Sequence, residues 1–328
     1  MRVLPDSLSA ALMARVTQRV RGDLDRSAME AVTGERQDVN RAVNGQLGQV
    51  HRLRRTLDDA QSVSARLAVS QTRFATASSA LTAMRESTQA LGLEAASAAV
   101  AGGAAGVDAF AATAREMVKA VASHLNARTG GRSLFAGAGA DGPALAPGEA
   151  ILDQLDALGA GAVTAADRSA AITAFFAPGG GFDAAYQGAA ERAAEAPLPD
   201  GSALPGLPKA DDPAFRALFE GLALIAAAGE VPEHQATDLA TRGADALRRA
   251  GEGIVVLEAS IGVASERVTA AEARQADEVR TSGEMLARLT GRDSFEAASE
   301  TQQLESRLEA AYALTARLSR LTLTSFLR

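Results

Sequence analysis

The sequence lacks several residue types on which small functional sites and compact cores depend. None of its 328 residues is cysteine or tryptophan, and aromatic residues make up only 4%. Without cysteine there is no disulfide framework, no thiolate metal site and no cysteine nucleophile. With so few aromatic side chains, we expect a thin core of closely packed helices.

Long apolar runs are also missing. The longest, Leu222 to Ala228, is far shorter than the roughly 18 residues that a membrane span requires. The first 20 residues contain no continuous apolar segment of the kind found in cleaved secretory signals. We therefore expect no membrane segment, and we expect that any export leaves the N-terminus in place.

The charge balance argues against nucleic acid as a partner. The chain has 33 basic and 40 acidic residues, a net charge of -7. A protein that binds nucleic acid or an anionic membrane surface normally has a basic face. No such excess is visible, so neither partner is expected.

The chemical groups that enzymes use are sparse and scattered. The three histidines, His51, His124 and His234, are far apart and have no ligand spacing around them, so no metal site is predicted. The glycines match neither a P-loop nor a dinucleotide fingerprint, and no nucleophile elbow is found. The sequence predicts no catalytic residue and no cofactor, and we expect a protein that is not an enzyme.

The clearest pattern is a seven-residue repeat between residues 46 and 98. Leu53, Ala60, Leu67, Phe74 and Leu81 form one apolar row, which predicts a helix roughly 75 Å long at 1.5 Å per residue. Glycines near 101–106 break it, and a second helix over 107–128 is expected to return antiparallel. The protein is therefore predicted to be elongated.

The middle of the chain follows different rules. Thr164 with Asp167 predicts a helix start, and Asp212 followed by Pro213 predicts another, which Gly229 ends. Asp200-Gly201 between proline-interrupted segments indicates one poor hairpin. We interpret 141–232 as a small inserted α+β domain.

Both ends of the chain have amphipathic helical patterns. Leucines and valines recur every four residues from Leu4 to Leu24, and a second apolar stripe follows Asp293 and Glu296, a predicted helix start. Apolar stripes of this size outside the main body are typical of interfaces, although the two ends could also pair with each other. The residues predicted to form the assembly interface are Leu4, Leu8, Leu12, Val16, Leu304, Leu308, Leu314, Leu318, Leu321, Phe326 and Leu327.

The expected fold is mainly α. It is an elongated antiparallel helical bundle or coiled coil, formed by the N- and C-terminal segments around the inserted middle domain. The predicted divisions are two assembly segments, the two halves of the bundle and the insertion, at 1–45, 46–140, 141–232, 233–290 and 291–328.

The order of these parts resembles the flagellin superfamily, and within it the hook–filament junction (hook-associated) type. Ala31-Val-Thr-Gly-Glu-Arg36 is similar to the family's L-S-T/S-G-x-R segment, and Arg132-Ser-Leu-Phe-Ala-Gly137 to its G-x-Y-L-F-A/S-G segment. The tail from Leu308 to Arg328 is similar to the family's leucine-rich ending. Asp38-Val-Asn40 departs from the family's N-x-x-x-D-D-P stretch, and Ser133 replaces an aromatic residue. The likeness covers roughly 1–140 and 235–328.

The resemblance implies a structural subunit of the bacterial flagellum that joins hook to filament and assembles through its terminal helices. It implies export without a cleaved signal peptide, an extracellular location, and termini that order only on assembly. The implied partners are other copies, the hook-side junction protein, flagellin and an export chaperone. A minor flagellin remains an alternative within the family, and a cytoplasmic coiled-coil scaffold or signalling helix bundle remains one outside it.

Overall fold

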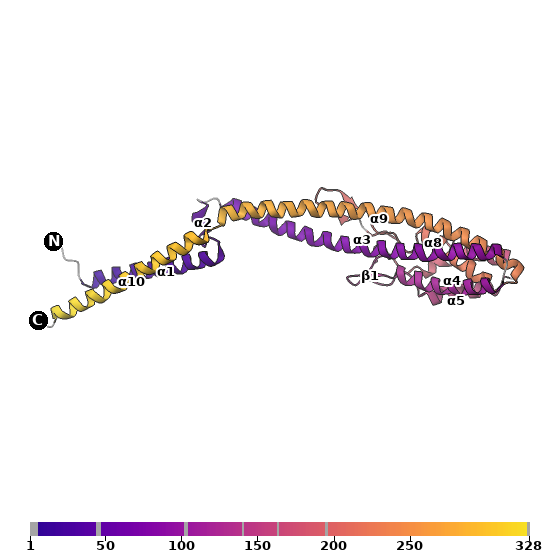
Figure 1. Cartoon of the computed structure of the whole chain (residues 1–328), viewed down its shortest axis with the longest axis horizontal. Coiled ribbons are helices and arrows are strands. Elements are labelled where there is room, and N and C mark those ends of the chain that lie inside the picture. Colours follow the sequence, from indigo (N-terminus) through magenta and orange to yellow (C-terminus); the bar gives the residue numbers. More distant parts are fainter. Residues whose placement is uncertain are drawn as a thin grey trace. The chain divides into compact units, whose positions relative to one another are not determined.

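The computed structural model describes residues 6–43, 47–101, 104–139, 141–162, 164–193 and 196–326, and it is mainly α, as predicted (Figure 1). The helices are α1 (Asp6–Thr33), α2 (Val39–Ala42), α3 (Leu47–Ala101), α4 (Ala104–Leu125), α5 (Gly148–Gly159), α6 (Ala165–Phe176), α7 (Phe182–Ala185), α8 (Pro213–Ala228), α9 (Glu233–Thr290) and α10 (Ser294–Phe326). The strands are β1 (Arg128–Thr129), β2 (Arg132–Ser133), β3 (Ala196–Pro197) and β4 (Ala203–Leu204).

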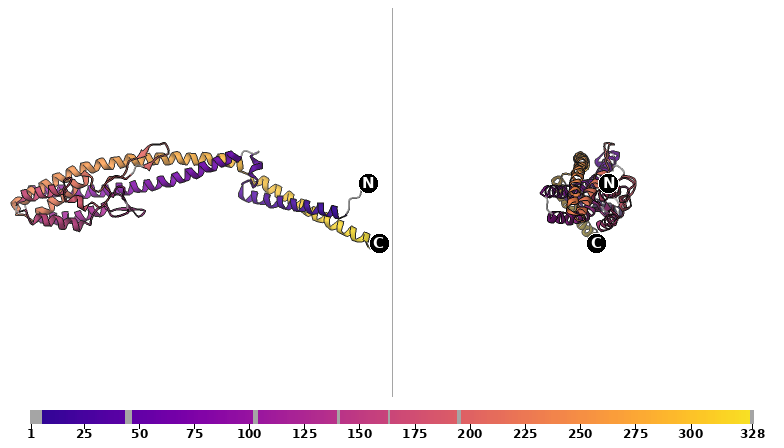
Figure 2. Two further views of the ribbon diagram at one scale, coloured as in Figure 1. Left: turned by 180° about the vertical axis from the view of Figure 1, so that it is seen from behind. Right: turned by 90° about the vertical axis from the view of Figure 1, so that its right-hand side faces the viewer.

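The chain divides into two compact units. Unit 1 combines Met1–Ser62 with Gln275–Arg328, and unit 2 is Val63–Arg274. Helices α3 and α9, with 55 and 58 residues, each contribute to both units. In unit 1, α1 and α10 lie side by side, as Figure 1 and the left view of Figure 2 show.

Helices α3 and α9 run antiparallel through unit 2. The seven-residue repeat is the buried face of α3, since Ala60, Leu67, Phe74 and Leu81 are all buried. Polar groups on the edge of this face join the two helices. Gln71 Nε2 donates to Ser265 Oγ at 3.0 Å, and Thr82 Oγ1 and Arg85 Nε both donate to the carboxylate of Glu258, at 2.9 and 3.0 Å.

The core of unit 2 contains several large aromatic side chains. Phe176, Phe182 and Phe219 pack with ring centroids 5.2 to 6.3 Å apart, and Phe135 meets Phe215 edge-on at 6.0 Å. The few phenylalanines are thus concentrated where α6, α7 and α8 meet. The cluster of buried side chains continues from there to α3, α4 and α9.

Local signals fix most helix ends in unit 2. Thr164 is the N-cap of α6, its side chain accepting from Asp167 N as predicted. The boundaries of α8 are also as predicted, with Pro213 in the first turn and Gly229 at the C-cap. Asp212, however, does not cap through its side chain, because its carboxylate pairs with Arg192 at 3.1 Å.

Two short hairpins connect these helices. The expected hairpin is present, with Ala196 opposite Leu204. A second, between β1 and β2, was not expected. Its two turn residues, Gly130 and Gly131, have φ values of +59° and +79°, as a type I′ turn requires. The second helix, expected over 107–128, ends at Leu125, before this hairpin.

Candidate assembly site

The seam between α1 and α10 is an antiparallel heptad contact within unit 1. The least exposed residues of both helices recur at alternating spacings of four and three, as in a coiled coil. On α1 and α10 they are Met13, Thr17, Val20, Leu24, Ser27, Ala297, Thr301, Leu304, Leu308 and Ala311.

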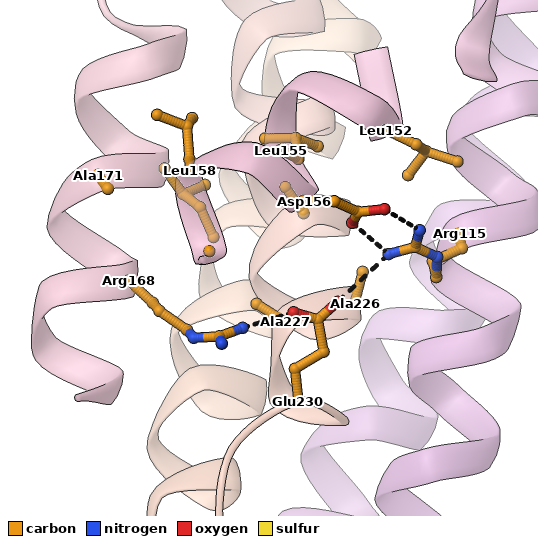
Figure 3. A pocket seen from close by; sticks show the side chains of 13 residues that line it. Arg115, Leu152, Leu155, Asp156, Leu158, Arg168, Ala171, Ala226, Ala227 and Glu230 are labelled. Atoms are coloured by element: carbon orange, nitrogen blue, oxygen red, sulfur yellow. Dashed lines mark hydrogen bonds and ion pairs between the residues drawn. The ribbon is translucent and has the colours of Figure 1, made fainter. Parts of the chain in front are cut away.

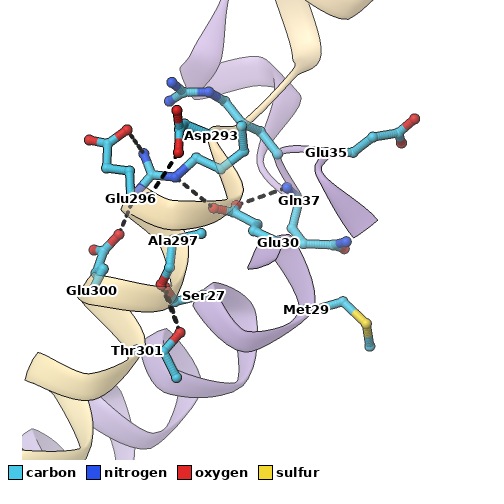
Figure 4. A network of polar contacts seen from close by, with 12 residues as sticks. Ser27, Met29, Glu30, Glu35, Gln37, Asp293, Glu296, Ala297, Glu300 and Thr301 are labelled. Carbon is cyan, nitrogen blue, oxygen red and sulfur yellow. Dashed lines mark hydrogen bonds and ion pairs between the residues drawn. The ribbon is translucent and has the colours of Figure 1, made fainter. Parts of the chain in front are cut away.

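A polar contact fixes the register of this seam near the joint between α9 and α10. Ser27 is buried, and its Oγ donates to the carbonyl oxygen of Ala297 at 2.9 Å, while Thr301 Oγ1 lies 3.2 Å from the same hydroxyl (Figure 4). A buried hydroxyl that loses its partner is costly, so a slip of one helix along the other is disfavoured. No feature of the sequence singled out Ser27.

Backbone hydrogen bonds hold the end of α1 against the joint between α9 and α10. Arg36 N donates to Thr290 O, and Arg292 N donates to Gly34 O, both at 2.8 Å. The side chain of Arg36 adds a bond from Nε to Gly291 O at 3.1 Å. The Thr33–Arg36 segment, which carries part of the family resemblance, therefore ties the end of α1 to the turn between α9 and α10.

Both glycines at the joint are required by the backbone. Gly34 has φ of +68°, and its N–H bonds Glu30 O to close the last turn of α1. A Cβ on Gly291 would lie 2.3 Å from Ala287 O, closer than any real contact. The chain can turn from α9 into α10 here only because Gly291 has no side chain.

A cluster of charges packs against the joint (Figure 4). Arg292, almost buried, pairs with Glu300 at 2.5 Å and lies 3.7 Å from carboxylate oxygens of both Glu30 and Glu296. Glu30 also accepts from Gln37 N at 2.9 Å. An almost buried arginine is stabilised only when carboxylates surround it, so this cluster favours the closed joint.

The predicted interface residues divide into three groups. Leu304 and Leu308 lie in the seam. Leu12, Val16 and Leu314 lie outside it and are about half exposed. For the rest, the structure describes only the backbone or nothing. Leu8, Leu318, Leu321 and Phe326 lie in helices whose side chains there are not described, and Leu4 and Leu327 lie outside the described residues.

The seam departs from the predicted row for a geometric reason. A row of residues spaced by four drifts by about 40° per step around an α-helix, so it cannot stay against one partner. The alternation of four and three keeps Val20 and Leu24 in contact and turns Leu12 and Val16 aside. Tyr312 and Leu314 of α10 are turned aside in the same way.

The second family-like segment, Arg132 to Gly137, has a structural role in unit 2. Leu134, Phe135 and Ala136 are buried, and the hydroxyl of Ser133 donates to Gly142 O. Gly137 has φ of +65°, and a Cβ there would lie 2.5 Å from Glu191 O. The segment therefore holds the loop after α4 against the core of unit 2, where Phe135 packs on Phe215.

A small cleft of about 20 Å³ between α4, α5, α6 and α8 is closed by ion pairs (Figure 3). Arg115 donates to both carboxylate oxygens of Asp156 at 2.7 and 2.6 Å, and it reaches Glu230 at 3.3 Å. Arg168 pairs with the other oxygen of Glu230 at 2.5 Å. The hydrogen bond from Arg115 is the largest cause that lowers the pKa of Asp156. The cleft has room for about one water molecule, so we interpret it as a clamp between helices.

Within the described residues, no group of three or more His, Cys, Asp or Glu side chains could hold a metal ion. Among the same residues, no helix is long and apolar enough to cross a membrane.

Comparisons with known proteins find similar chains among the solved structures. No family model matches the sequence, and no curated protein matches it. The fold is similar to that in the crystal structure of Bacillus cereus FlgL, with a TM-score of 0.40 and 13% identity over 74% of this chain and 96% of that one. A likeness at this level identifies no function.

Proposed function

We propose that this chain is a structural subunit of the bacterial flagellum that joins hook to filament, and that it assembles through α1 and α10. The observation that carries the proposal is that the two terminal helices, α1 and α10, pair with each other. They form an antiparallel seam, and the Thr33–Arg36 segment, which resembles the family's motif, closes its base. The order of parts along the sequence is the other support.

The terminal helices leave apolar surface free after pairing with each other. The seam uses one face of each helix, while Leu12, Val16, Tyr312 and Leu314 remain about half exposed beside it. Apolar side chains that recur on the free face of a paired helix are typical of a surface that meets further helices. Neighbouring copies, arranged in a ring, are the partners that this function requires.

The proposal also covers location and the remaining partners. The subunit would contact the hook-side junction protein on one side and flagellin on the other, and an export chaperone would cover its terminal helices before assembly. Its place is outside the cell, reached by export without a cleaved signal peptide. Nothing in the described residues points to a catalytic role.

Two measurements test the proposal. Immunogold labelling of isolated flagella should place the protein at one point between hook and filament. Label along the whole shaft would favour a minor flagellin, and absence from sheared flagella would favour a cytoplasmic scaffold.

The second measurement uses the full chain with Leu12→Ser and Val16→Ser. Both residues are outside the seam, so the circular dichroism spectrum should remain that of the wild type. The variant should be exported but not incorporated. Normal incorporation would contradict assembly through this face, and Val32→Ser, on an exposed residue of the same helix, is the matched control.

A further inference from the structure

Arg73 of α3 is a partly buried arginine that has no carboxylate beside it. Among the described residues, its guanidinium takes part in no ion pair and in no hydrogen bond. Burial lowers the pKa of Arg73, and the nearby charge of Arg132, on β2, lowers it further. A cation that has lost part of its hydration and faces a second cation is destabilised unless an anion joins the two.

Other partly buried arginines of unit 2 show what this position lacks. Each of four pairs with a carboxylate, in the pairs Arg85–Glu258, Arg115–Asp156, Arg168–Glu230 and Arg216–Asp183. A fifth, Arg267, lies near the carboxylate of Asp200. At Arg73 the neighbouring charge is another arginine, so the negative charge that this fold supplies elsewhere is missing there.

The two segments that meet at this point contain basic residues and no acidic ones. Residues 60–85 of α3 include three arginines but no Asp or Glu. Residues 117–140, which contain the β1–β2 hairpin, include two arginines and a lysine, again without an acid. The local charge is therefore positive, in a chain whose net charge is -7.

The hairpin is anchored at the same part of the core as Arg73. Phe74 follows Arg73 on α3, Leu134 lies two residues after Arg132, and both belong to one cluster of buried side chains. Ser133, between Arg132 and Leu134, is buried as well. The two guanidinium groups thus come from different elements to one edge of the core of unit 2.

The hairpin is held in shape by the chain itself, and it offers a third donor. Arg128 Nε donates to Gly131 O, and Arg128 Nη2 donates to Asp141 O, both at 3.1 Å. Thr129 is directly opposite Arg132 in the strand register, and side chains of paired residues share one face. In the part of the chain that the structure describes, the hydroxyl of Thr129 makes no hydrogen bond.

This group of side chains matches one class of ligand. Both guanidinium groups only donate hydrogen bonds, and the two together carry two positive charges. The planar fork of an arginine fits a pair of oxygens on a carboxylate or a phosphate, and such charge-assisted hydrogen bonds are the strong ones. A ligand with several oxygens can bind both forks at once and still accept from a hydroxyl.

We propose that Arg73, Arg132 and Thr129 form an oxyanion-binding site that takes a phosphate or a carboxylate group. The anion lies between the two guanidinium groups and accepts a further hydrogen bond from the hydroxyl of Thr129. The inference goes beyond the proposed function and does not depend on it, because no residue of the terminal helices takes part.

Titration calorimetry of the full chain tests the site. The probes are sodium phosphate and sodium citrate, used separately, with sodium chloride keeping the ionic strength constant, so the two kinds of oxyanion are compared. We expect saturable binding of at least one probe. Binding should be at least tenfold weaker in Arg73→Gln and in Arg132→Gln, because each variant loses charge-assisted hydrogen bonds to the anion.

Arg66→Gln is the matched control, because Arg66 is an exposed arginine of the same helix, seven residues before Arg73. This variant should bind the probes like the wild type. The inference is overturned if neither probe binds saturably, or if Arg73→Gln binds as well as the wild type. An equal loss in Arg66→Gln would also overturn it, since the attraction would then be a general effect of charge.

The melting temperature separates a ligand site from a structural role. Without phosphate or citrate, Arg73→Gln should not lower the melting temperature, because it breaks no ion pair and removes a repulsion from Arg132. Arg85→Gln, which leaves Glu258 without its arginine, should lower it. A probe that binds should raise the melting temperature of the wild type and leave that of Arg73→Gln unchanged. A lower melting temperature of Arg73→Gln in plain buffer would show that Arg73 already has a partner within the chain, and the site would be refuted.

Discussion

The seam between α1 and α10 makes a quantitative prediction for two leucines of the same helix. Leu304 is 7% exposed and lies in the seam, whereas Leu314 is 52% exposed and lies beside it. Replacing a buried leucine by alanine costs about 2 to 5 kcal/mol, and in a two-helix seam we expect the lower part, about 2 to 3 kcal/mol. Leu314→Ala should change stability by no more than about 0.5 kcal/mol, as is usual for surface positions.

Native-state hydrogen exchange measures this difference directly. A loss of about 2 to 3 kcal/mol corresponds to roughly a 30- to 150-fold rise in the opening equilibrium. The amides of α1 should lose protection by that factor in Leu304→Ala, although the change is on α10, because α1 is held in unit 1 by its seam with α10. Amides in the middle of α8, in unit 2, should be unaffected.

The assigned register of the seam would be refuted if the two variants changed the protection of the α1 amides equally. If Leu304→Ala and Leu314→Ala lower the protection of α1 alike, the seam does not follow the alternating row. If neither does, the two helices are not held together by this contact at all.

Three further predictions concern two glycines of the α9 region, the ion pair of Asp156 and the partly buried phenol of Tyr186. Gly291→Ala should lower the melting temperature because its Cβ would overlap a carbonyl oxygen, whereas Gly283→Ala, in open space, should raise stability by about 0.5 to 1 kcal/mol. The hydrogen bond from Arg115 lowers the pKa of Asp156 in the folded protein. At a pH between the folded and the unfolded pKa, the unfolded chain therefore binds more protons than the folded one. This carboxylate therefore stabilises the folded protein above its unfolded pKa of about 3.9, and that stabilisation is lost as the pH falls through its folded pKa. Asp156→Asn should therefore flatten the fall in unfolding free energy measured as the pH drops below about 4. Burial, with a smaller effect of a nearby carboxylate, raises the pKa of Tyr186 to about 12, and ultraviolet titration of the Tyr312→Phe chain should show its single phenol ionising there while the protein stays folded.

Helix ends were the most predictable feature of this protein. Thr164 with Asp167, and Asp212 with Pro213, mark helix starts through interactions within one turn, so a reading of neighbouring residues identifies them. The hairpin at Gly130-Gly131 has an equally local signal, two glycines between short segments, yet it was not predicted.

The candidate site was predictable only in part. The sequence indicated that both ends of the chain are amphipathic, and it singled out Leu304 and Leu308, which lie in the seam. It did not indicate Ser27 or Arg292, because a serine or an arginine in a helical sequence has no mark that distinguishes a buried position from a solvated one. The role of Ser27 depends on Ala297, which is 270 residues away in the sequence. The role of Arg292 depends on the carboxylate of Glu30.

The sequence by itself determined the helices, their ends and the apolar rows, because these depend on propensities and spacings within a few turns. Only the tertiary structure decided which row of α1 faces α10 and which is left exposed, since Leu12 and Val20 are equally apolar and the partner helix alone distinguishes them. It also decided that most of the phenylalanines gather in one core, whereas Phe295 is exposed. Those outcomes depend on distances between segments that no local pattern encodes.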